Sequence, residues 1–505
     1  MSVAARVRLV VPIVALCGVA ACGTTVQLPA GVTATTGGSA SSGLSLPPGA
    51  GGSGSTATTV PSAAGTTPLA GGEGAAISTS SRPVIHTTAP VGVPGSSKTT
   101  GPVGKLGHTP VSIGFFVSKD VGGEFKALGY GGLSTGDGAQ EVRASVKLVN
   151  AKGGIAGHPI KPIIIEEDPE STTENTYQQA CATFFQDNHV TAVVSLVYSP
   201  VFSSCAAQHQ ALLLFASLGS TLSASALRAA PTTVVTDMPT IDTDAADVTD
   251  ALIKEGFFKG GTSLTSKPVI GLITLDSPSY ASAQSIVSQH LAAAGLKLTD
   301  TFKMPAGNES SDIARASAAG QSAVLRFKAE GINHVVFVSG GFGASWFGVD
   351  ARTESYYPRL GWGSAETPGL EPQVLSPRQL SGSEGIGWSP TLDTSPQFEP
   401  TLGSHGAACI KALRAGGVDM SVGATLAVAL PICDATFLLA APPATSTLTG
   451  LGLLAGIQQL ATSYSSAMNF TTDFRNRAAT AGARPIAYKA GCDCFRYVGP
   501  IQPLR

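Results

Sequence analysis

Charged residues are scarce in this 505-residue chain, and the two signs nearly cancel. Asp, Glu, Lys and Arg make up 13% of the sequence, and the formal net charge is −2. A protein that binds nucleic acid through its phosphates needs a concentrated basic surface. No run of like charges is present to supply one. We therefore expect no nucleic-acid partner.

The sequence also lacks the spacings that mark common catalytic and metal sites. Its histidines have no second ligand at metal-site spacing. Gly450-Leu451-Gly452 follows no strand pattern and is not a dinucleotide fingerprint. The G-x-S-x-G pattern around Ser134 lacks the hydrophobic strand that precedes a nucleophile elbow, so a serine hydrolase is the less favoured alternative. We expect no enzymatic activity, no metal and no cofactor.

The first 22 residues have the pattern of an export signal. Arg6 and Arg8 precede an apolar stretch that is too short to span a bilayer. Small residues stand directly before Cys22, which is typical of a bacterial lipobox, where the cysteine is acylated and becomes the first mature residue. An ordinary cleavage site is the alternative. Two or three acyl chains would anchor the protein stably on the extracytoplasmic face of the cell membrane.

Residues 23–107 are almost entirely Gly, Ser, Thr, Ala and Pro, with few charges and no hydrophobic period. Such a segment cannot bury enough apolar surface to offset the entropy lost on ordering. We predict a disordered tether that holds a folded domain away from the membrane. The Thr, Ser and Pro content also permits O-glycosylation.

Export changes how the remaining cysteines are interpreted, because disulfides persist outside the cytoplasm. Six cysteines follow the signal, and they allow 15 pairings. Proximity in the sequence favours three of these pairs. They are Cys181 with Cys205, Cys409 with Cys433, and Cys492 with Cys494. A metal or redox role for the last pair is the alternative.

From Val111 onward the chain alternates between short apolar runs and helical periods. Residues 111–116, 160–166, 190–196 and 212–215 are predicted strands, and 172–187 is a predicted helix. Asp137 and Gln140 resemble a capping box before a helix. The pattern restarts after residue 247, with strands expected at 269–275, 296–302, 334–339 and 359–363. Strands that alternate with helices predict parallel sheets covered on both faces.

Residues 423–441 are the most apolar stretch after the signal, so a second membrane anchor is an alternative there. Pro431 and Asp434 interrupt the stretch, and a charge at the centre of a membrane is costly. We therefore favour a buried helix.

Small hydroxyl residues, glycines and single aromatics follow four of the predicted strands. In doubly wound sheets ligands bind beyond the carboxyl ends of the strands. Loops of this kind offer backbone N–H groups and hydroxyls to a carboxylate or a similar group. Ordinary caps and turns would give the same residue types at any single loop. The four segments are 197–200, 217–220, 276–280 and 339–343.

One motif resembles a known family. Residues 148–157, Leu-Val-Asn-Ala-Lys-Gly-Gly-Ile-Ala-Gly, are similar to the "IN-A-x-GGI-x-G" signature of branched-chain amino acid binding proteins. These are type 1 periplasmic binding proteins that serve ABC transporters. The likeness runs from about residue 110 to 505 and is strongest up to about residue 238. It implies an α/β fold of two lobes with parallel sheets flanked by helices.

The resemblance also implies which residues hold the ligand. Ser199, with Leu218, Gly219 and Ser220, matches positions that bind the ligand carboxylate. Tyr280 matches a tyrosine that closes over the ligand, and Glu366 matches the acid that pairs with its amine. The family often has aromatics where this chain has Gly340 and Gly341. A small polar ligand, an amino acid, amide or related molecule, is expected.

The expected organisation follows from the signal, the tether and the two lobes. Its parts are a signal with lipobox at 1–22, a tether at 23–107, a first lobe at 108–238, a second lobe at 239–375, and segments returning to both lobes at 376–505. The ligand would close the lobes by hinge rotation for delivery to an ABC permease. A sensor or surface receptor with the same clamshell and no transport is the alternative.

Overall fold

The computed structural model describes most of the chain after residue 108. The described ranges are 109–120, 122, 134–168, 173–216, 221–259, 267–306, 310–341, 343–394, 403–420, 423–443 and 446–505. The export signal, Cys22 and the tether predicted from the sequence lie outside them. So do Leu218, Gly219 and Ser220.

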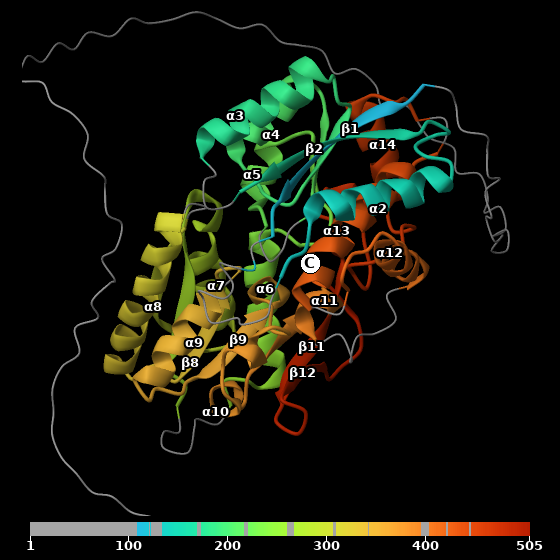
Figure 1. Cartoon of the computed structure of the whole chain (residues 1–505). Helices are drawn as coiled ribbons and strands as arrows, with labels where there is room; N and C mark the ends of the chain where they lie inside the picture. The colour runs from blue at the N-terminus through green and yellow to red at the C-terminus, as the bar shows by residue number, and fades with distance from the viewer. Residues whose placement is uncertain are drawn as a thin grey trace, which may run out of the picture. The chain divides into compact units, whose positions relative to one another are not determined.

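The first sheet is parallel throughout and has the strand order β2-β1-β3-β4-β5. Its first two strands, β1 and β2, are labelled in Figure 1. Parallel neighbours cannot be joined by a tight hairpin, so each connection between them is a crossover, usually through a helix. The sequence prediction of a parallel α/β fold is thereby confirmed. The strands are β1 (Val111–Ser118), β2 (Ile160–Glu167), β3 (Ala192–Ser195), β4 (Leu212–Phe215) and β5 (Thr233–Val235).

Helices cover both faces of this sheet because alternate strand residues point to opposite sides. Phe115 belongs to the core under one group of helices, and Phe116 to the core under the other. The first group is α2 (Gly138–Ala151), α12 (Gly403–Ala415), α13 (Gly423–Ala440) and α14 (Gly450–Leu460). The second group is α3 (Glu174–Cys181), the π-helical Ala182–Asp187 and α4 (Pro200–Gln208).

Local signals explain where two of these helices begin. Asp137 caps α2 by accepting the backbone N–H of Gln140, as expected. The reciprocal half of the predicted capping box is wrong, because the Gln140 amide donates instead to the carbonyl of Gly416. Helix α4 begins at Pro200, since Ser199 caps it and proline suits the first helical turn.

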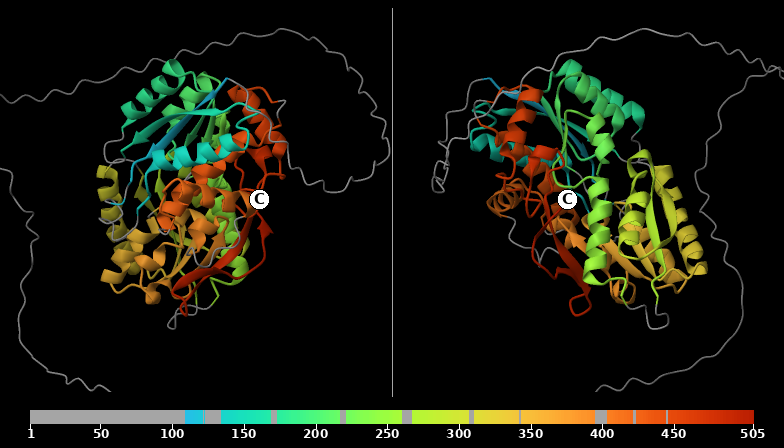
Figure 2. Two further views of the ribbon diagram at one scale, coloured as in Figure 1. Left: turned by 45° about the vertical axis from the view of Figure 1, so that its right-hand side comes forward. Right: turned by 180° about the vertical axis from the view of Figure 1, so that it is seen from behind.

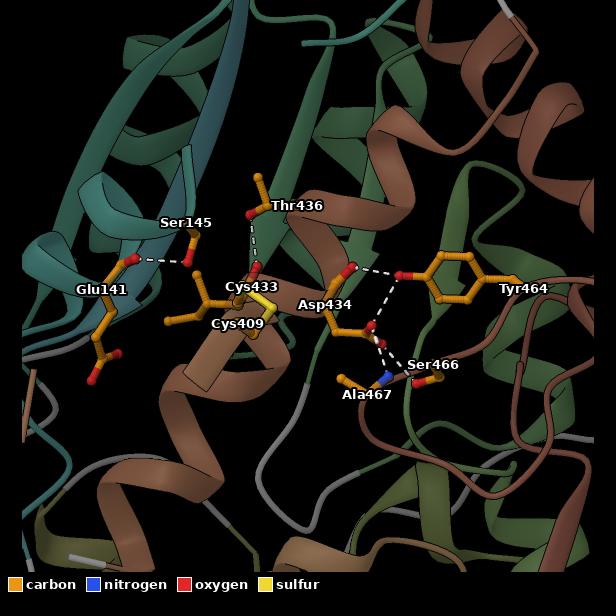
Figure 3. Close-up of a disulfide and its surroundings, with 10 residues drawn as sticks. Glu141, Ser145, Cys409, Cys433, Asp434, Thr436, Tyr464, Ser466 and Ala467 are labelled. Atoms are coloured by element: carbon orange, nitrogen blue, oxygen red, sulfur yellow. Dashed lines mark hydrogen bonds between the residues drawn. A yellow bond between two sulfur atoms is a disulfide. The ribbon is translucent and has the colours of Figure 1, made fainter. Parts of the chain in front are cut away.

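The apolar segment at 423–440 forms α13, a helix packed within the first core. Its Asp434 carboxylate is buried and accepts hydrogen bonds from Tyr464, Ser466 and the backbone of Ala467 (Figure 3). Those bonds explain how a carboxylate is tolerated at this position. No helix in the described part of the chain is both long and apolar enough to cross a membrane.

The second sheet has the order β12-β11-β10-β9-β8-β6-β7, with β13 paired to β11. Its pairs from β7 through β10 are parallel, whereas β11 runs antiparallel to β10 and β12. The strands are β6 (Ile270–Asp276), β7 (Leu298–Pro305), β8 (His334–Val338), β9 (Arg359–Gly363), β10 (Glu384–Gly387), β11 (Gly482–Lys489), β12 (Cys494–Tyr497) and β13 (Gln502–Pro503).

Two helix layers flank this sheet too (Figure 2). One face carries α6 (Ile241–Glu255) and α7 (Ala283–Ala293), and the other carries α8 (Ser310–Ala329) and α9 (Gly343–Thr353). Shorter helices are α5 (Ala224–Ala229), α10 (Pro377–Leu380) and α11 (Pro390–Asp393). The core beneath α6 and α7 also contains Phe215 and Val235 from the first sheet, so the two lobes share apolar packing.

The chain passes between the two lobes three times. The first crossover leads from β5 to α6, the second from β10 to α12, and the third from α14 to β11. The buried Asn469 amide, on the third crossover, donates to the carbonyls of Asp237 and Trp388 on the other two. One side chain therefore holds all three crossovers together.

Three disulfides are present in the structure. Cys181–Cys205 joins α3 to α4, Cys409–Cys433 joins α12 to α13, and Cys492–Cys494 closes the turn between β11 and β12. Each of the first two disulfides links neighbouring helices on one face of the first sheet. The two faces are opposite, so each helix layer has one of these disulfides.

Candidate functional site

A pocket of about 380 Å³ lies between the lobes, beside the carboxyl ends of β3 and β6. The first lobe contributes the start of α4 and helix α5, and the second lobe contributes the turn after β6. The residues that line it are Tyr198, Pro200, Ser203, Ser204, Ser223, Ser225, Ala226, Ala229, Ala230, Pro278 and Ser279. Five serines and a tyrosine supply hydroxyls, and none of these lining residues is charged.

Ser199 lies between two lining residues, and its hydroxyl has a structural partner. Its Oγ accepts the backbone N–H of Phe202 at 3.4 Å and caps α4. The side chain is 6% exposed. Tyr198, one residue earlier, is half-buried, and its ring lies 5.7 Å from that of Phe215. Burial raises the pKa of the Tyr198 hydroxyl, which stays neutral and able to donate a hydrogen bond.

Two residues of the turn after β6 line the pocket, and the third packs into the core. Pro278 and Ser279 line the pocket, whereas the Tyr280 ring packs into the core beneath α6 and α7. Burial raises the pKa of the Tyr280 hydroxyl, and the nearby carboxylates Asp244 and Glu366 raise it further. In this arrangement Tyr280 supports the turn from behind.

Glu366 is fully buried at the carboxyl end of β9, and both of its oxygens are engaged. Oε1 accepts the backbone N–H groups of Ser339 and Gly340 at 2.9 and 3.0 Å, and Oε2 accepts that of Gly363 at 3.0 Å. Burial raises the pKa of this carboxyl to about 7, and the three N–H bonds oppose the rise. In this conformation Glu366 ties the end of β8 to the end of β9.

A second buried acid, Asp244 on α6, lies beside Glu366. Burial raises the pKa of the Asp244 carboxyl well above its ordinary value, and the charges of Glu366 and Asp247 add to the rise. Its Oδ1 has no hydrogen-bond partner among the described residues. The three N–H groups favour the charged form of Glu366, whereas burial and the neighbouring carboxylates favour the protonated form of Asp244.

Asp242, which the sequence did not single out, connects the two sides of the pocket. Its Oδ2 accepts the backbone N–H of Ala224, at the start of α5, at 2.6 Å. Its Oδ1 accepts the Ser282 hydroxyl, just after the β6 turn, at 3.1 Å. The Thr- and Asp-rich composition of residues 236–247 was the only sequence signal for this role. Asp242 thus contacts both segments that form the walls of the pocket.

Comparison with known families identifies one match. Residues 122–352 match a family described as periplasmic binding protein. No curated protein sequence matches the chain.

Solved structures with this architecture are numerous, and three illustrate the range. An ABC transporter substrate-binding protein from Aeropyrum pernix has a TM-score of 0.58 at 14% identity, covering 78% of this chain and 96% of the other. LivJ from Streptococcus pneumoniae, a branched-chain amino acid substrate-binding protein in complex with isoleucine, has a TM-score of 0.53 at 15% identity. The match covers 78% of this chain and 100% of LivJ. A fatty acid ABC transporter substrate-binding protein from Thermomonospora curvata has a TM-score of 0.53 at 16% identity. The match covers 80% of this chain and 96% of the other. These identities are low, so the likeness concerns the fold.

Proposed function

We propose that this chain, which belongs to the periplasmic binding protein family through residues 122–352, captures a small polar solute for an ABC importer. The pocket between the lobes, with its ring of serine hydroxyls, is the observation that carries the proposal. Sites of this kind bind small molecules through a few placed polar groups in an otherwise apolar surround. The solved structures of similar fold, one in complex with isoleucine and one from a fatty acid transporter, support the solute-binding role.

An amino acid, amide or related molecule fits the chemistry of the pocket, and the neutral amide fits best. Glu366, the acid that would pair with a ligand amine, is fully occupied by backbone N–H groups. No charged side chain lines the pocket among the described residues. Hydroxyls both donate and accept hydrogen bonds, as an amide group requires.

Binding would follow a hinge motion of the two lobes. We assign residues 108–238 to the first lobe, 239–375 to the second, and 376–505 to segments that return to both. The packing of α12 to α14 on the first sheet and the addition of β11 and β12 to the second support this division. The solute binds one lobe first, and closure removes it from water against the other. Affinity then reflects the interactions that form only in the closed state, which the permease would recognise.

A thermal-shift screen with amino acids, amides, urea, polyamines and aromatic acids tests the proposal. A bound solute stabilises the folded protein, so the true ligand class should raise the midpoint of thermal unfolding. Amides are expected to give the largest increase. If no solute in the set changes the midpoint, the proposed class is wrong.

Ser199 and Ser220 should contribute directly to affinity once a ligand is known. The double variant Ser199→Ala/Ser220→Ala is expected to weaken binding about tenfold or more, since each hydrogen bond to a charged group contributes about 1.5–3 kcal/mol and neutral ones less. Calorimetric titration measures the change. Ser199→Ala also removes the cap of α4, so an exposed cap variant, Thr173→Ala on α3, is the matched stability control. Unchanged affinity in the double variant would contradict the assignment.

Membrane attachment through Cys22 is part of the same proposal. The variant Cys22→Ala should no longer be acylated and should move from the membrane fraction to the soluble fraction. Cell fractionation with immunodetection measures this. Cys17→Ala, in the same signal but after a bulky leucine, is the control and should remain with the membrane. Continued membrane association of the Cys22 variant would show that another element holds the protein there.

A further inference from the structure

A second pocket, which the proposed solute site does not use, lies against the crossovers. Its volume is about 370 Å³. Helix α5 forms one wall, the first crossover contributes Pro239 and Thr240, and the third crossover contributes Arg477 and Thr480. We call it the hinge pocket, because two of the three connections between the lobes line it.

Two guanidinium groups in the hinge pocket have no carboxylate partner in the part of the chain that the structure describes. Arg228, on the last turn of α5, is exposed, and no described residue bonds to its side chain. Arg477 is half-buried and donates from Nη1 to the carbonyls of Ala230 and Thr233, at 2.6 and 3.1 Å. Carbonyl oxygens satisfy some of its N–H groups and leave its charge unneutralised.

The acidic groups around the hinge pocket are already engaged. Arg475 holds the Asp473 carboxylate through Nε and Nη2. Asp247 and Asp250 pair with the Arg505 guanidinium. Asp242 faces the start of α5 and the hydroxyl of Ser282. Among the residues that line the hinge pocket, three guanidinium groups face one carboxylate, beside the hydroxyls of Thr240, Thr243 and Thr480; these charged residues are Arg228, Arg477, Arg505 and Asp473.

The backbone conformation of Arg477 indicates that the surrounding structure holds this residue in place. Its φ is +58°, a conformation that costs energy for any residue with a Cβ. The carbonyl of Arg477 accepts the N–H of Val235 at 2.7 Å, which fixes it to the end of the first sheet. A strained residue held by the sheet directs a guanidinium into the pocket wall.

Helix α5 separates the hinge pocket from the pocket between the lobes. Leu227 and Arg228 line the hinge pocket, whereas Ser225, Ala226 and Ala229 line the other. The helix is short, with six residues. A ligand that fixes one of its sides therefore also restricts the wall of the opposite pocket.

We propose that the hinge pocket binds a small anion bearing a carboxylate or phosphate group, held by Arg228 and Arg477, and that α5 transmits its occupancy to the pocket between the lobes. Guanidinium forks match the geometry of both anions. The three threonine hydroxyls supply further donors. The proposal stands independently of the solute that the protein carries.

Titration with inorganic phosphate and with citrate, at constant ionic strength, tests the binding step. At least one of them should raise the midpoint of thermal unfolding of the full chain, and Arg228→Gln should weaken the apparent affinity about tenfold or more. Arg414→Gln is the matched control, since Arg414 is also exposed on the last turn of a helix and outside the pocket. Arg477→Lys keeps the positive charge and loses the paired N–H donors of the guanidinium. This variant should therefore bind the anion more weakly while the protein remains folded.

Two outcomes would overturn the proposal. One is the absence of any stabilisation by either anion, and the other is an equal response in the Arg228 and Arg414 variants. The coupling step has its own readout, which is hydrogen exchange of the backbone amides at 224–230 and 279–280. Both segments should exchange more slowly with the anion bound, and a change confined to the crossovers would show that α5 transmits nothing. No solute of the other pocket is needed, so a failure here leaves the solute-binding proposal intact.

Discussion

Replacing Asn469 with leucine should lower the free energy of unfolding by about 3–5 kcal/mol. The Asn469 Nδ2 lies 2.9 Å from the carbonyl oxygen of Asp237, 3.0 Å from Thr480 Oγ1 and 3.4 Å from the carbonyl oxygen of Trp388. Leucine has a similar volume and no donor. Two buried carbonyls and a hydroxyl would then lose this partner, and each unsatisfied group costs about 1–3 kcal/mol.

The effect should extend beyond stability, because the three acceptors belong to the three crossovers. Hydrogen exchange at residues 236–240 and 466–481 is expected to quicken in the leucine variant even under conditions where the protein stays folded. Chemical unfolding and hydrogen exchange measure the two effects separately. Asn476→Leu is the control, since Asn476 is exposed on the same crossover. If both variants unfold at the same denaturant concentration, the amide does not hold the crossovers together.

The first sheet could be predicted almost entirely from the sequence, because its strands are short continuous apolar runs. Leu212–Phe215 is β4 as expected, and in the second sheet Arg359–Gly363 is β9 as expected. The predicted helix at 172–187 exists, but its second half is π-helical. Residues buried on both faces give a strong local signal, which explains why these elements needed no tertiary information.

The third crossover and the last strands could not be predicted in the same way. Asn469 is 232 positions from Asp237 and 81 from Trp388. Nothing near Asn469 in the sequence indicates which carbonyls it will reach. Strands β11 and β12 lie at the end of the second sheet and run antiparallel there, so they break the alternation that predicted the rest.

The candidate site shows the same limit at the level of single side chains. The sequence indicated the loops that follow β3, β4, β6 and β8, and those after β3 and β6 meet at the pocket between the lobes. It did not indicate which way their side chains point. Tyr280 turns into the core, and Glu366 turns onto the backbone of Ser339 and Gly340. The orientation depends on neighbours such as Asp244, far away in the sequence.

Glu141 on α2 carries the second large prediction, because its carboxyl group is buried and no described residue forms a hydrogen bond with it. It lies near Gly136, whose φ of +82° and lack of a side chain leave room for it, since a Cβ there would lie 2.6 Å from Oε1. Figure 3 shows the side chain pointing away from Ser145, which bonds only to the Glu141 carbonyl. Burial raises the pKa of this carboxyl to about 9, and Asp137 and Asp120 add to the rise.

The variant Glu141→Gln should therefore be more stable than the natural chain at neutral pH. Between the ordinary carboxyl pKa and about 9, the folded protein holds a proton that the unfolded chain releases, so the natural chain loses stability as pH rises. Glutamine needs no proton. The difference in unfolding free energy should be near zero at acidic pH and reach about 3 kcal/mol at pH 7, at roughly 1.4 kcal/mol per unit of pKa.

Denaturant unfolding of both proteins across this pH range measures the difference between them. Glu366 and Asp393, whose pKa values burial also raises to about 7, lose stability with pH in the natural chain and the variant alike. Their contributions therefore cancel in the difference. Glu166→Gln is the matched control, because Glu166 is exposed on β2 of the same lobe, and its effect should be small at every pH. A Glu141 variant whose advantage does not grow with pH would show that this carboxyl is ionised in the folded protein, with a partner that the structure does not reveal.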